Sequence, residues 1–187
     1  MRVHIVGASG SGTTTLGRAL ARRLAFTHLD TDDFYWLPSD PPFQHVRERG
    51  ARQALLGAAL SREPGWVLSG SLCGWGDGFI PLFDLVVFLW IPPEVRMARL
   101  RERERTRYGA AIDPGGPSYE ASQAFLAWAA GYDETLQPPE RCRRLHEDWL
   151  AGLPCPVVRF QDATPVEAHL ERLETYLQTR QPAGGSP

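Results

Sequence analysis

The sequence contains no lysine: all 20 of its basic residues are arginine. No site in this chain can therefore use a lysine ammonium group. Cysteine is also scarce, with Cys73, Cys142 and Cys155 far apart and no C-x-x-C pair. Such a sparse, odd set argues against a disulfide framework or a zinc site, and predicts a reducing, cytoplasmic location. No apolar run approaches the roughly 18 residues that span a bilayer, so no membrane partner is expected.

The balance of charge and apolar residues bounds the class of protein. A net charge of −2 provides no global basic field, so a nucleic-acid partner is not expected. A chain of 187 residues that is 43% hydrophobic has the size and composition of one domain with a real core. We expect that domain over residues 1–180, followed by a flexible tail rich in proline, glycine and serine at 181–187.

Short apolar runs alternate with helical patterns along the chain, which indicates an α/β fold. Strands are predicted at 3–6, 26–29, 66–68, 84–91 and 156–160, and helices at 13–25, 46–62, 93–105, 119–130, 139–150 and 165–177. We therefore expect a five-stranded parallel sheet flanked by helices on both faces, with a loop at 106–118. A ligand of such a sheet binds outside the carboxyl ends of the strands.

A glycine-rich stretch follows the first predicted strand and opens the first predicted helix. It fits the phosphate-binding pattern G-x-x-x-x-G-K-[ST] at Gly7, Gly12 and Thr14, but Thr13 stands at the lysine position. The backbone N–H groups of such a loop and the following helix N-terminus bind phosphate oxygens, and the Thr14 hydroxyl would bind Mg²⁺. The predicted nucleotide-binding residues here are Gly7, Ser9, Gly10, Ser11, Gly12, Thr13, Thr14 and Thr15. The alternative is a strand-to-helix turn without a ligand.

Two carboxylates, Asp30 and Asp32, follow the second predicted strand. Residues two apart on an extended segment share a face, so the pair could divide two tasks. Asp30 would hold Mg²⁺ together with Thr14, directly or through water. Asp32 would accept the proton of an acceptor hydroxyl or position that hydroxyl. The alternative is helix capping by Thr31, Asp32 or Asp33, among which Asp33 is the favoured cap.

These motifs resemble those of the small P-loop kinases, the group of adenylate kinase-like and shikimate or gluconate kinase-like enzymes. The resemblance rests on Gly7 to Thr14, Asp30-x-Asp32, Ser69-Gly70-Ser71 and the arginine-rich stretch Arg99 to Arg107. It implies a P-loop NTPase fold with a small mobile lid at about 101–118. It also implies Mg²⁺-dependent transfer of the γ-phosphoryl group of ATP to a small acceptor.

Five arginines alternate with other residues before and within the predicted lid. If this stretch is helical, its side chains spread round the helix, so one face cannot use them all. The resemblance implies that lid arginines close on the phosphates. We predict that Arg101 or Arg105 supplies the catalytic charge that Thr13 lacks, and that Arg107 binds the nucleotide. Arg99 and Arg103 are interpreted as a solvated, salt-bridged part of the helix.

The acceptor site is predicted from residues that follow the second and third strands. The candidates are Asp32, Phe34, Trp36, Arg47 and Gly70, with Tyr35 and Trp75 as further aromatic residues. The aromatic run from Phe34 to Trp36 could stack on a planar base, although core packing explains it equally well. Gly70 would allow close approach of a ligand, or serve a tight turn. Asp84 begins a strand and so is not expected to bind the metal of a phosphate site, and no histidine has metal-ligand spacing.

The sequence thus favours an ATP-binding, Mg²⁺-dependent kinase whose acceptor is a nucleoside monophosphate or a small hydroxylated metabolite. One alternative is a catalytically weak or inactive nucleotide-binding regulatory module, which Thr13 supports and the Asp30-x-Asp32 pair opposes. A third, weaker alternative is a kinase that acts on a nucleic-acid end, which the net charge disfavours. The choice between ATP and GTP and the oligomeric state stay open.

Overall fold

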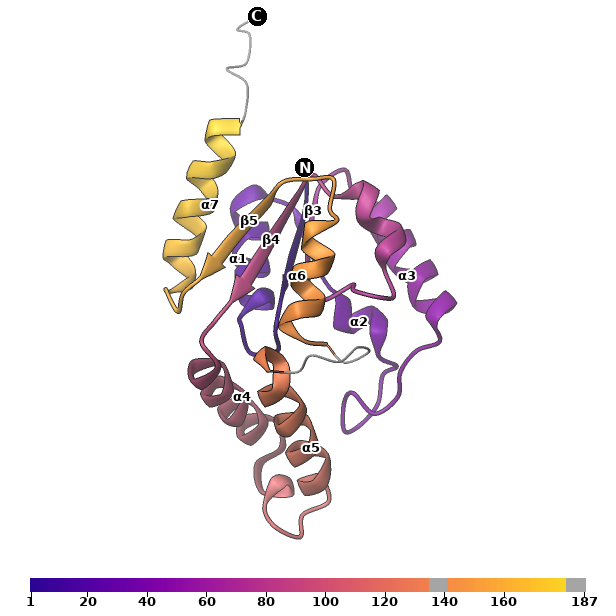
Figure 1. Ribbon diagram of the computed structural model, residues 1–187. Coiled ribbons are helices and arrows are strands. Elements are labelled where there is room, and N and C mark those ends of the chain that lie inside the picture. Colours follow the sequence, from indigo (N-terminus) through magenta and orange to yellow (C-terminus); the bar gives the residue numbers. More distant parts are fainter. Residues whose placement is uncertain (135–140, 181–187) are drawn as a thin grey trace, which may run out of the picture.

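The computed structural model describes residues 1–134 and 141–180, and its centre is a five-stranded parallel sheet (Figure 1). The strands are β1 (Arg2–Gly7), β2 (Thr27–Asp30), β3 (Trp66–Ser69), β4 (Leu85–Trp90) and β5 (Val157–Gln161). They lie in the order β2-β3-β1-β4-β5, and every neighbouring pair is parallel. The prediction of a five-stranded parallel sheet is therefore confirmed, and each strand end lies within one residue of its predicted position.

Helices cover both faces of the sheet, as predicted. They are α1 (Thr13–Leu24), α2 (Thr31–Tyr35), α3 (Arg49–Ser61), α4 (Pro93–Tyr108), α5 (Tyr119–Ala130), α6 (Arg143–Ala151) and α7 (Val166–Arg180), with short 3-10 helices η1 (Asp77–Leu82), η2 (Gly109–Ile112) and η3 (Gly131–Asp133). On one face Ile5 packs with Leu16 of α1 and Leu173 of α7. On the other face Val6 packs with Leu56 of α3 and Leu150 of α6. Adjacent residues of β1 therefore bury their side chains in opposite layers, which requires the continuous apolar runs seen in the sequence.

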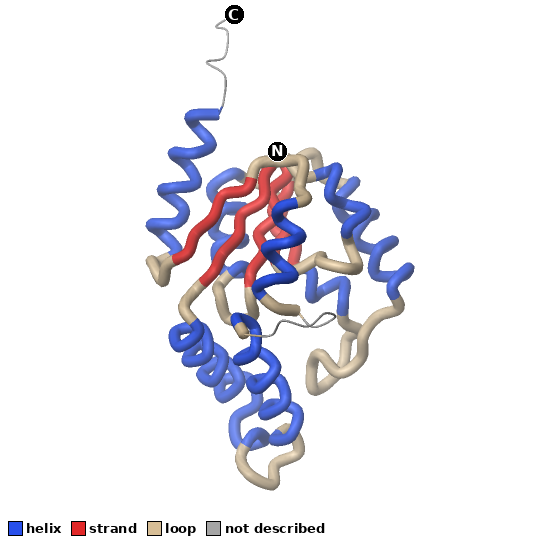
Figure 2. The backbone as a smooth tube through the Cα atoms, in the orientation of Figure 1, coloured by secondary structure: helices blue, strands red, loops and turns tan. Residues whose placement is uncertain are grey.

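Helices α4 and α5 form a hairpin that extends beyond the carboxyl ends of the strands (Figures 1 and 2). The loop predicted at 106–118 is largely wrong, because α4 continues to Tyr108 and η2 follows it. The residues before Gly109 contain no helix breaker, and glycine is the first that ends the helix well. Only 113–118 remain without a helix. This hairpin occupies the region predicted as a lid, and its motion stays a prediction.

Two other predicted helices begin later than expected. Helix α3 begins at Arg49 because the Glu48 carboxylate accepts the Ala51 N–H at 2.8 Å and caps it, while Val46 pairs with Trp36 in a short antiparallel bridge. Helix α6 begins at Arg143; the predicted start at 139 and the tail at 181–187 lie outside the described residues.

Two predicted absences can be compared with the part of the chain that the structure describes. The three cysteines are free. Within residues 1–134 and 141–180, no helix has both the length and the apolar character to cross a bilayer.

Candidate functional site

The glycine-rich loop connects β1 to α1 at the carboxyl edge of the sheet. Gly12 is the N-cap of α1 with φ 96°, a left-handed conformation that suits glycine, and no side chain caps the helix. The first α-helical hydrogen bond runs from the Leu16 N–H to the Gly12 carbonyl at 2.9 Å. The N–H groups of the first turn, Thr13 to Thr15, thus have no side-chain acceptor at the cap and are available to an anion.

Helix α4 packs directly against this loop. A Cβ placed on Gly10 would lie 2.8 Å from the Arg96 carbonyl oxygen and 2.9 Å from the Leu100 side chain. Arg96 is fully buried, and its guanidinium donates to the carbonyls of Ser9 (3.5 Å) and Ala129 (2.7 Å) and to the Asp133 carboxylate (3.0 Å). One buried arginine therefore fixes the loop against the ends of α5 and η3.

The predicted metal ligands, Thr14 and Asp30, lie in contact. The Thr14 hydroxyl donates to Asp30 Oδ2 at 2.7 Å, and Ser69 Oγ approaches the same oxygen at 3.3 Å. His28 Nε2 lies 3.0 Å from Ser69 Oγ; burial lowers the pKa of His28, against the attraction of Asp30. A chain of polar side chains thus orients Asp30 from behind.

A hard cation such as Mg²⁺ fits this corner chemically, because hydroxyl and carboxylate oxygens are its preferred ligands. In the described part of the chain no three histidine, cysteine or acidic side chains gather as a metal cluster. Thr14 and Asp30 would therefore hold part of the coordination shell, and phosphate oxygens and water the remainder.

The prediction that Asp33 caps a helix is wrong. Asp30 is the N-cap of α2, has extended backbone, and accepts the Asp32 N–H at 3.1 Å. Asp33 already lies inside the helix, past the position from which a side chain reaches the first free N–H groups. Asp32 also lies in the helix rather than on the strand, so the two carboxylates face different partners.

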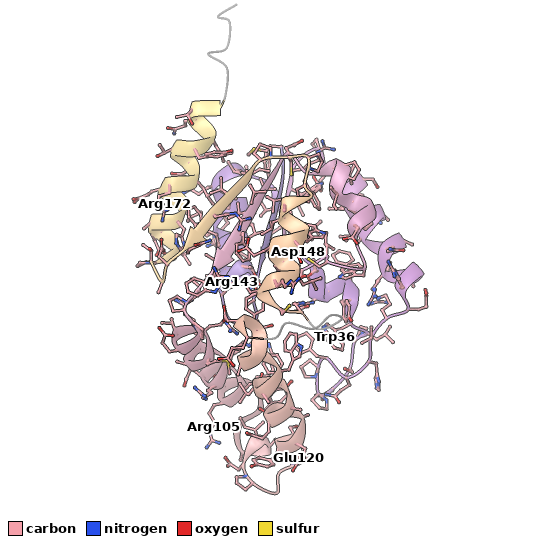
Figure 3. The ribbon with its side chains drawn as sticks, in the orientation of Figure 1. Trp36, Arg105, Glu120, Arg143, Asp148 and Arg172 are labelled. Atoms are coloured by element: carbon pink, nitrogen blue, oxygen red, sulfur yellow. The ribbon has the colours of Figure 1, made fainter. Side chains whose placement is uncertain are left out.

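A cavity of about 480 Å³ adjoins Asp32 and the P-loop residue Ser9. Its walls come from α2, the loop that follows it, the α4–α5 hairpin and Arg141; Figure 3 labels Trp36 in that loop. The lining residues are Ser9, Asp32, Tyr35, Trp36, Pro42, Phe43, Gln44, Arg103, Glu104, Arg107, Tyr108, Ser118, Ala121, Ser122, Phe125, Trp128 and Arg141. This volume and mixture of aromatic and polar groups are typical of a small-molecule site.

Three arginines in the cavity each lie over an aromatic ring. The distances from the guanidinium carbon to the ring centroid are 5.6 Å for Arg103 on Phe125, 4.8 Å for Arg107 on Phe43, and 5.8 Å for Arg141 on Trp128. Within the described chain none of these three arginines forms an ion pair. Three cations are thus held in place by aromatic rings without forming an ion pair in the described residues, which favours an anionic ligand.

Two carboxylates also face the cavity. Glu104 is buried and accepts a hydrogen bond from Ser122 Oγ at 3.1 Å. Asp32 keeps solvent exposure, yet desolvation by its surroundings raises its pKa, and the negative charge of Asp30 adds to this rise. Arg141 and Arg103 oppose the rise, so both lie close enough to act on Asp32 electrostatically.

The structure separates the arginines of α4 into two faces. Arg103 and Arg107 follow Arg96 and Leu100 at helical spacing, on the face toward the loop and cavity. Arg101 and Arg105 lie on the other side, are exposed and do not line the cavity; Arg105 pairs with Asp113 and projects outward (Figure 3). The geometry gives no support to the predicted catalytic roles of Arg101 and Arg105, and places Arg107 in the wall of the cavity beside the P-loop.

The predicted acceptor residues are also divided. Asp32 and Trp36 line the cavity, together with Tyr35. Phe34 packs in the core, and Arg47 donates to the carbonyls of Phe34 (3.0 Å) and Trp36 (3.2 Å), which leaves it a structural role.

Two further residues from the third-strand region belong to the interior. A Cβ on Gly70 would lie 1.8 Å from Thr31 Oγ1, so this glycine permits packing of α2 rather than approach of a ligand. Trp75 is buried, and its indole N–H donates to the Ser71 carbonyl at 2.9 Å. Asp84 pairs with Arg2 at the start of β1, at the sheet edge opposite the P-loop, as its position before a strand predicts.

Sequence reasoning missed several cavity residues. Arg103 could have been found from its spacing to Leu100, once that leucine was taken as the buried side of the helix. Glu104, Ser122, Phe125 and Trp128 come together only through the hairpin, and no local signal marks them.

A separate buried chain of hydrogen bonds joins Ser71, His146 and Tyr132. His146 Nε2 lies 3.1 Å from Ser71 Oγ, and its Nδ1 lies 2.8 Å from the Tyr132 hydroxyl. Burial lowers the pKa of His146 to about 3.

Comparisons with known sequences agree with this geometry. The AAA_18 family model, described as an AAA domain, matches residues 3–124. Uncharacterized protein YqaC of Bacillus subtilis (strain 168) is 49% identical over 177 residues, which are 95% of this chain and 97% of that protein. The cytidylate kinase of Archaeoglobus fulgidus is 28% identical over 115 residues, which are 56% of this chain and 62% of that enzyme.

Solved structures share the fold at low sequence identity. Shikimate kinase from Bacteroides thetaiotaomicron gives a TM-score of 0.57 at 19% identity, over 95% of this chain and 98% of its own. Shikimate kinase from Acinetobacter baumannii, solved with shikimate, gives a TM-score of 0.57 at 17% identity. The match covers 97% of this chain and 95% of that enzyme. Because the family match covers more than half of the sequence, the chain belongs to the AAA_18 family and is a kinase-like member of the adenylate kinase and shikimate kinase superfamily of P-loop proteins.

Proposed function

We propose that this protein transfers the γ-phosphoryl group of ATP to a hydroxyl group of a small anionic acceptor. The observation that carries the proposal is the cavity beside the P-loop, where Asp32 faces the same space as three arginines that have no ion pair among residues 1–134 and 141–180. A carboxylate with a raised pKa suits proton transfer from a hydroxyl, and the arginines suit a carboxylate or phosphate elsewhere on the acceptor.

Each part of the site has a role in this proposal. The P-loop N–H groups and the N-terminus of α1 bind the phosphates of ATP. Thr14 and Asp30 would hold Mg²⁺, which neutralises charge on the β- and γ-phosphates when bound. Asp32 orients the acceptor hydroxyl and accepts its proton. Arg103, Arg107 and Arg141 hold the anionic end of the acceptor, and the aromatic rings enclose its body.

A nucleoside monophosphate is a second candidate acceptor. The aromatic lining of the cavity suits a base, and cytidylate kinases from Archaeoglobus fulgidus and Methanocorpusculum labreanum are 28% and 29% identical to part of this chain. In that reaction a phosphate oxygen attacks, and an ionised Asp32 beside it would repel the nucleophile. The position of Asp32 therefore favours the hydroxyl acceptor.

The first experiment is titration calorimetry with ATP, with and without Mg²⁺, on the wild type and Gly12→Val. Valine cannot adopt the φ of Gly12 without strain and blocks the approach of phosphate, so we expect loss of ATP binding. Gly78→Val is the control, because a Cβ there meets nothing within 4 Å. Thermal melting of both variants checks that they fold.

A coupled ADP-release assay then compares hydroxylated cyclic carboxylates and phosphates with the nucleoside monophosphates. Turnover of a hydroxyl acceptor supports the proposal, and turnover of nucleoside monophosphates alone supports the second candidate. ATP binding without turnover of any acceptor would support a nucleotide-binding regulatory module, which the loss of the P-loop lysine at Thr13 also favours. A wild type that binds no ATP would remove the kinase proposal.

A further inference from the structure

The P-loop lacks the cation that its sequence pattern normally carries. Thr13 can offer a hydroxyl but no charge, and the chain holds no lysine elsewhere. Phosphoryl transfer depends on stabilising negative charge that develops between the β- and γ-phosphates. A cation from another element is therefore needed beside this loop if the site is a working kinase.

Arg99 of α4 places a cation beside this loop. Its Nη1 atom is 3.9 Å from the place where a Cβ on Gly12 would lie, and Gly12 directly precedes Thr13. The Arg99 side chain is exposed, and within the described residues it has no ion pair or hydrogen bond. Its charge is thus available at the end of the phosphate loop.

The packing of α4 fixes where Arg99 can reach. Arg96 and Leu100, on either side of it in sequence, contact Gly10 of the loop, and Arg96 is buried. The backbone of Arg99 is therefore held in place, while its long side chain can move by several ångströms. Arg101, two residues later, lies on the other side of the helix, so a small rotation does not bring it to the loop.

We propose that Arg99 supplies the positive charge that Thr13 cannot, through direct contact with phosphate oxygens of the donor nucleotide. The planar guanidinium offers two parallel donors to adjacent phosphate oxygens, a geometry that an ammonium group lacks. This inference rests on the proposed function, because it requires that ATP binds at the P-loop. It assigns to Arg99 a role that the sequence pattern favoured for Arg101 or Arg105.

The test measures dissociation constants for Mg²⁺-bound ATP and ADP and for AMP by calorimetry. The proteins are the wild type, Arg99→Ala, Arg99→Lys, the double variant Arg99→Ala with Thr13→Lys, Arg101→Ala, and Arg62→Ala as an exposed arginine control directly after α3. We expect Arg99→Ala to weaken ATP binding about tenfold or more, ADP binding less, and AMP binding hardly at all. Arg99→Lys or the added lysine at Thr13 should restore part of the lost affinity.

The outcomes separate this inference from the proposed function. If the wild type binds ATP and Arg99→Ala binds it equally well, the inference is wrong and the proposed function stands. An equal loss for all three nucleotides would mean that Arg99 contacts the nucleoside part, which also overturns it. The inference is also wrong if Arg101→Ala weakens ATP binding and Arg99→Ala does not. It is equally wrong if neither Arg99→Lys nor the added lysine at Thr13 restores any ATP affinity. If the wild type binds no ATP, both proposals fall.

Discussion

The two halves of the candidate site are built in different ways. The donor half consists of one continuous loop, Gly7 to Thr15, and the corner formed by Thr14 and Asp30, where short side chains bond to one another. The acceptor half takes side chains from α2, its following loop, α4, α5 and Arg141, and holds three arginines that form no ion pair with any residue the structure describes. Backbone groups therefore dominate one half and charged side chains the other.

This difference predicts how each half responds to substitution. A backbone cradle keeps its N–H groups when a side chain is lost, so we expect the donor half to bind phosphate even with threonine at the lysine position. A cavity that recognises its ligand through a few guanidinium groups loses a large part of its affinity with each one. Three substitutions test this contrast, from the largest expected effect to the smallest.

Asp32→Asn is expected to reduce turnover of a hydroxyl acceptor by about 100-fold or more, with ATP affinity unchanged. The variant keeps the shape of the side chain but removes the base. In the wild type the raised pKa of Asp32 places the acid limb of the pH–rate profile above the ordinary aspartate value, so activity falls as pH drops through that limb.

Arg103→Ala removes a cation that lowers the pKa of Asp32, and should move the acid limb of the pH–rate profile to higher pH.

The stability of Asp32→Asn provides an internal control. A carboxyl whose pKa is raised on folding destabilises the folded state at neutral pH, where it is ionised, and this penalty disappears as pH falls through the raised pKa. We therefore expect the variant to melt at or above the wild-type temperature at pH 7. Undiminished turnover in a well-folded variant would point to a phosphate nucleophile instead.

Arg107→Ala is expected to weaken acceptor binding by about tenfold to a hundredfold, with a smaller change in ATP binding. The reason is the loss of a guanidinium that lies over Phe43 and faces the cavity. Steady-state KM for the acceptor and calorimetry with ATP give the two affinities. Arg62→Ala, at an exposed position directly after α3, is the control. If the affinity for ATP falls more than the affinity for the acceptor, Arg107 binds the nucleotide, as the sequence analysis predicted.

Ser69→Ala is expected to raise the Mg²⁺ concentration needed for half-maximal activity by about three- to tenfold. Ser69 Oγ approaches Asp30 Oδ2 at 3.3 Å and helps to orient it, but Thr14 holds the same oxygen at 2.7 Å. A Mg²⁺ titration at saturating ATP measures the effect. Ser61→Ala, which removes a hydroxyl bonded within α3, should leave the requirement unchanged. An equal shift in both variants would exclude a role for Ser69 in positioning Asp30.

The same contrast explains which features could be predicted from the sequence. The glycine-rich loop and the Thr14–Asp30 contact follow from motifs that lie at the ends of predicted parallel strands, because such strands bring those ends to one edge of the sheet. Local sequence patterns identified the donor half because its residues lie near one another in the sequence or directly follow strands.

The acceptor half was harder because its residues meet only in three dimensions. The choice of Arg101 and Arg105 ignored the direction set by Leu100, whose burial decides which arginines face the loop. Arg47 was predicted to bind a ligand, yet its guanidinium donates to the backbone carbonyls of Phe34 and Trp36. Arg141 reaches the cavity from a segment with no motif, so only the packed structure reveals it.

The buried arginine of α4 also connects the P-loop to a tryptophan. Asp133 accepts the indole N–H of Trp90 at 2.6 Å and a hydrogen bond from Arg96, while Arg96 donates to the Ser9 carbonyl. A ligand that changes the hydrogen bonding of the Ser9 carbonyl therefore also changes the polarisation of the Trp90 indole N–H bond. The effect passes through the charged side chains of Arg96 and Asp133. In a nitrogen-15 NMR spectrum the indole resonance of Trp90 is thus a natural reporter of phosphate binding, from a ring that need not touch the nucleotide.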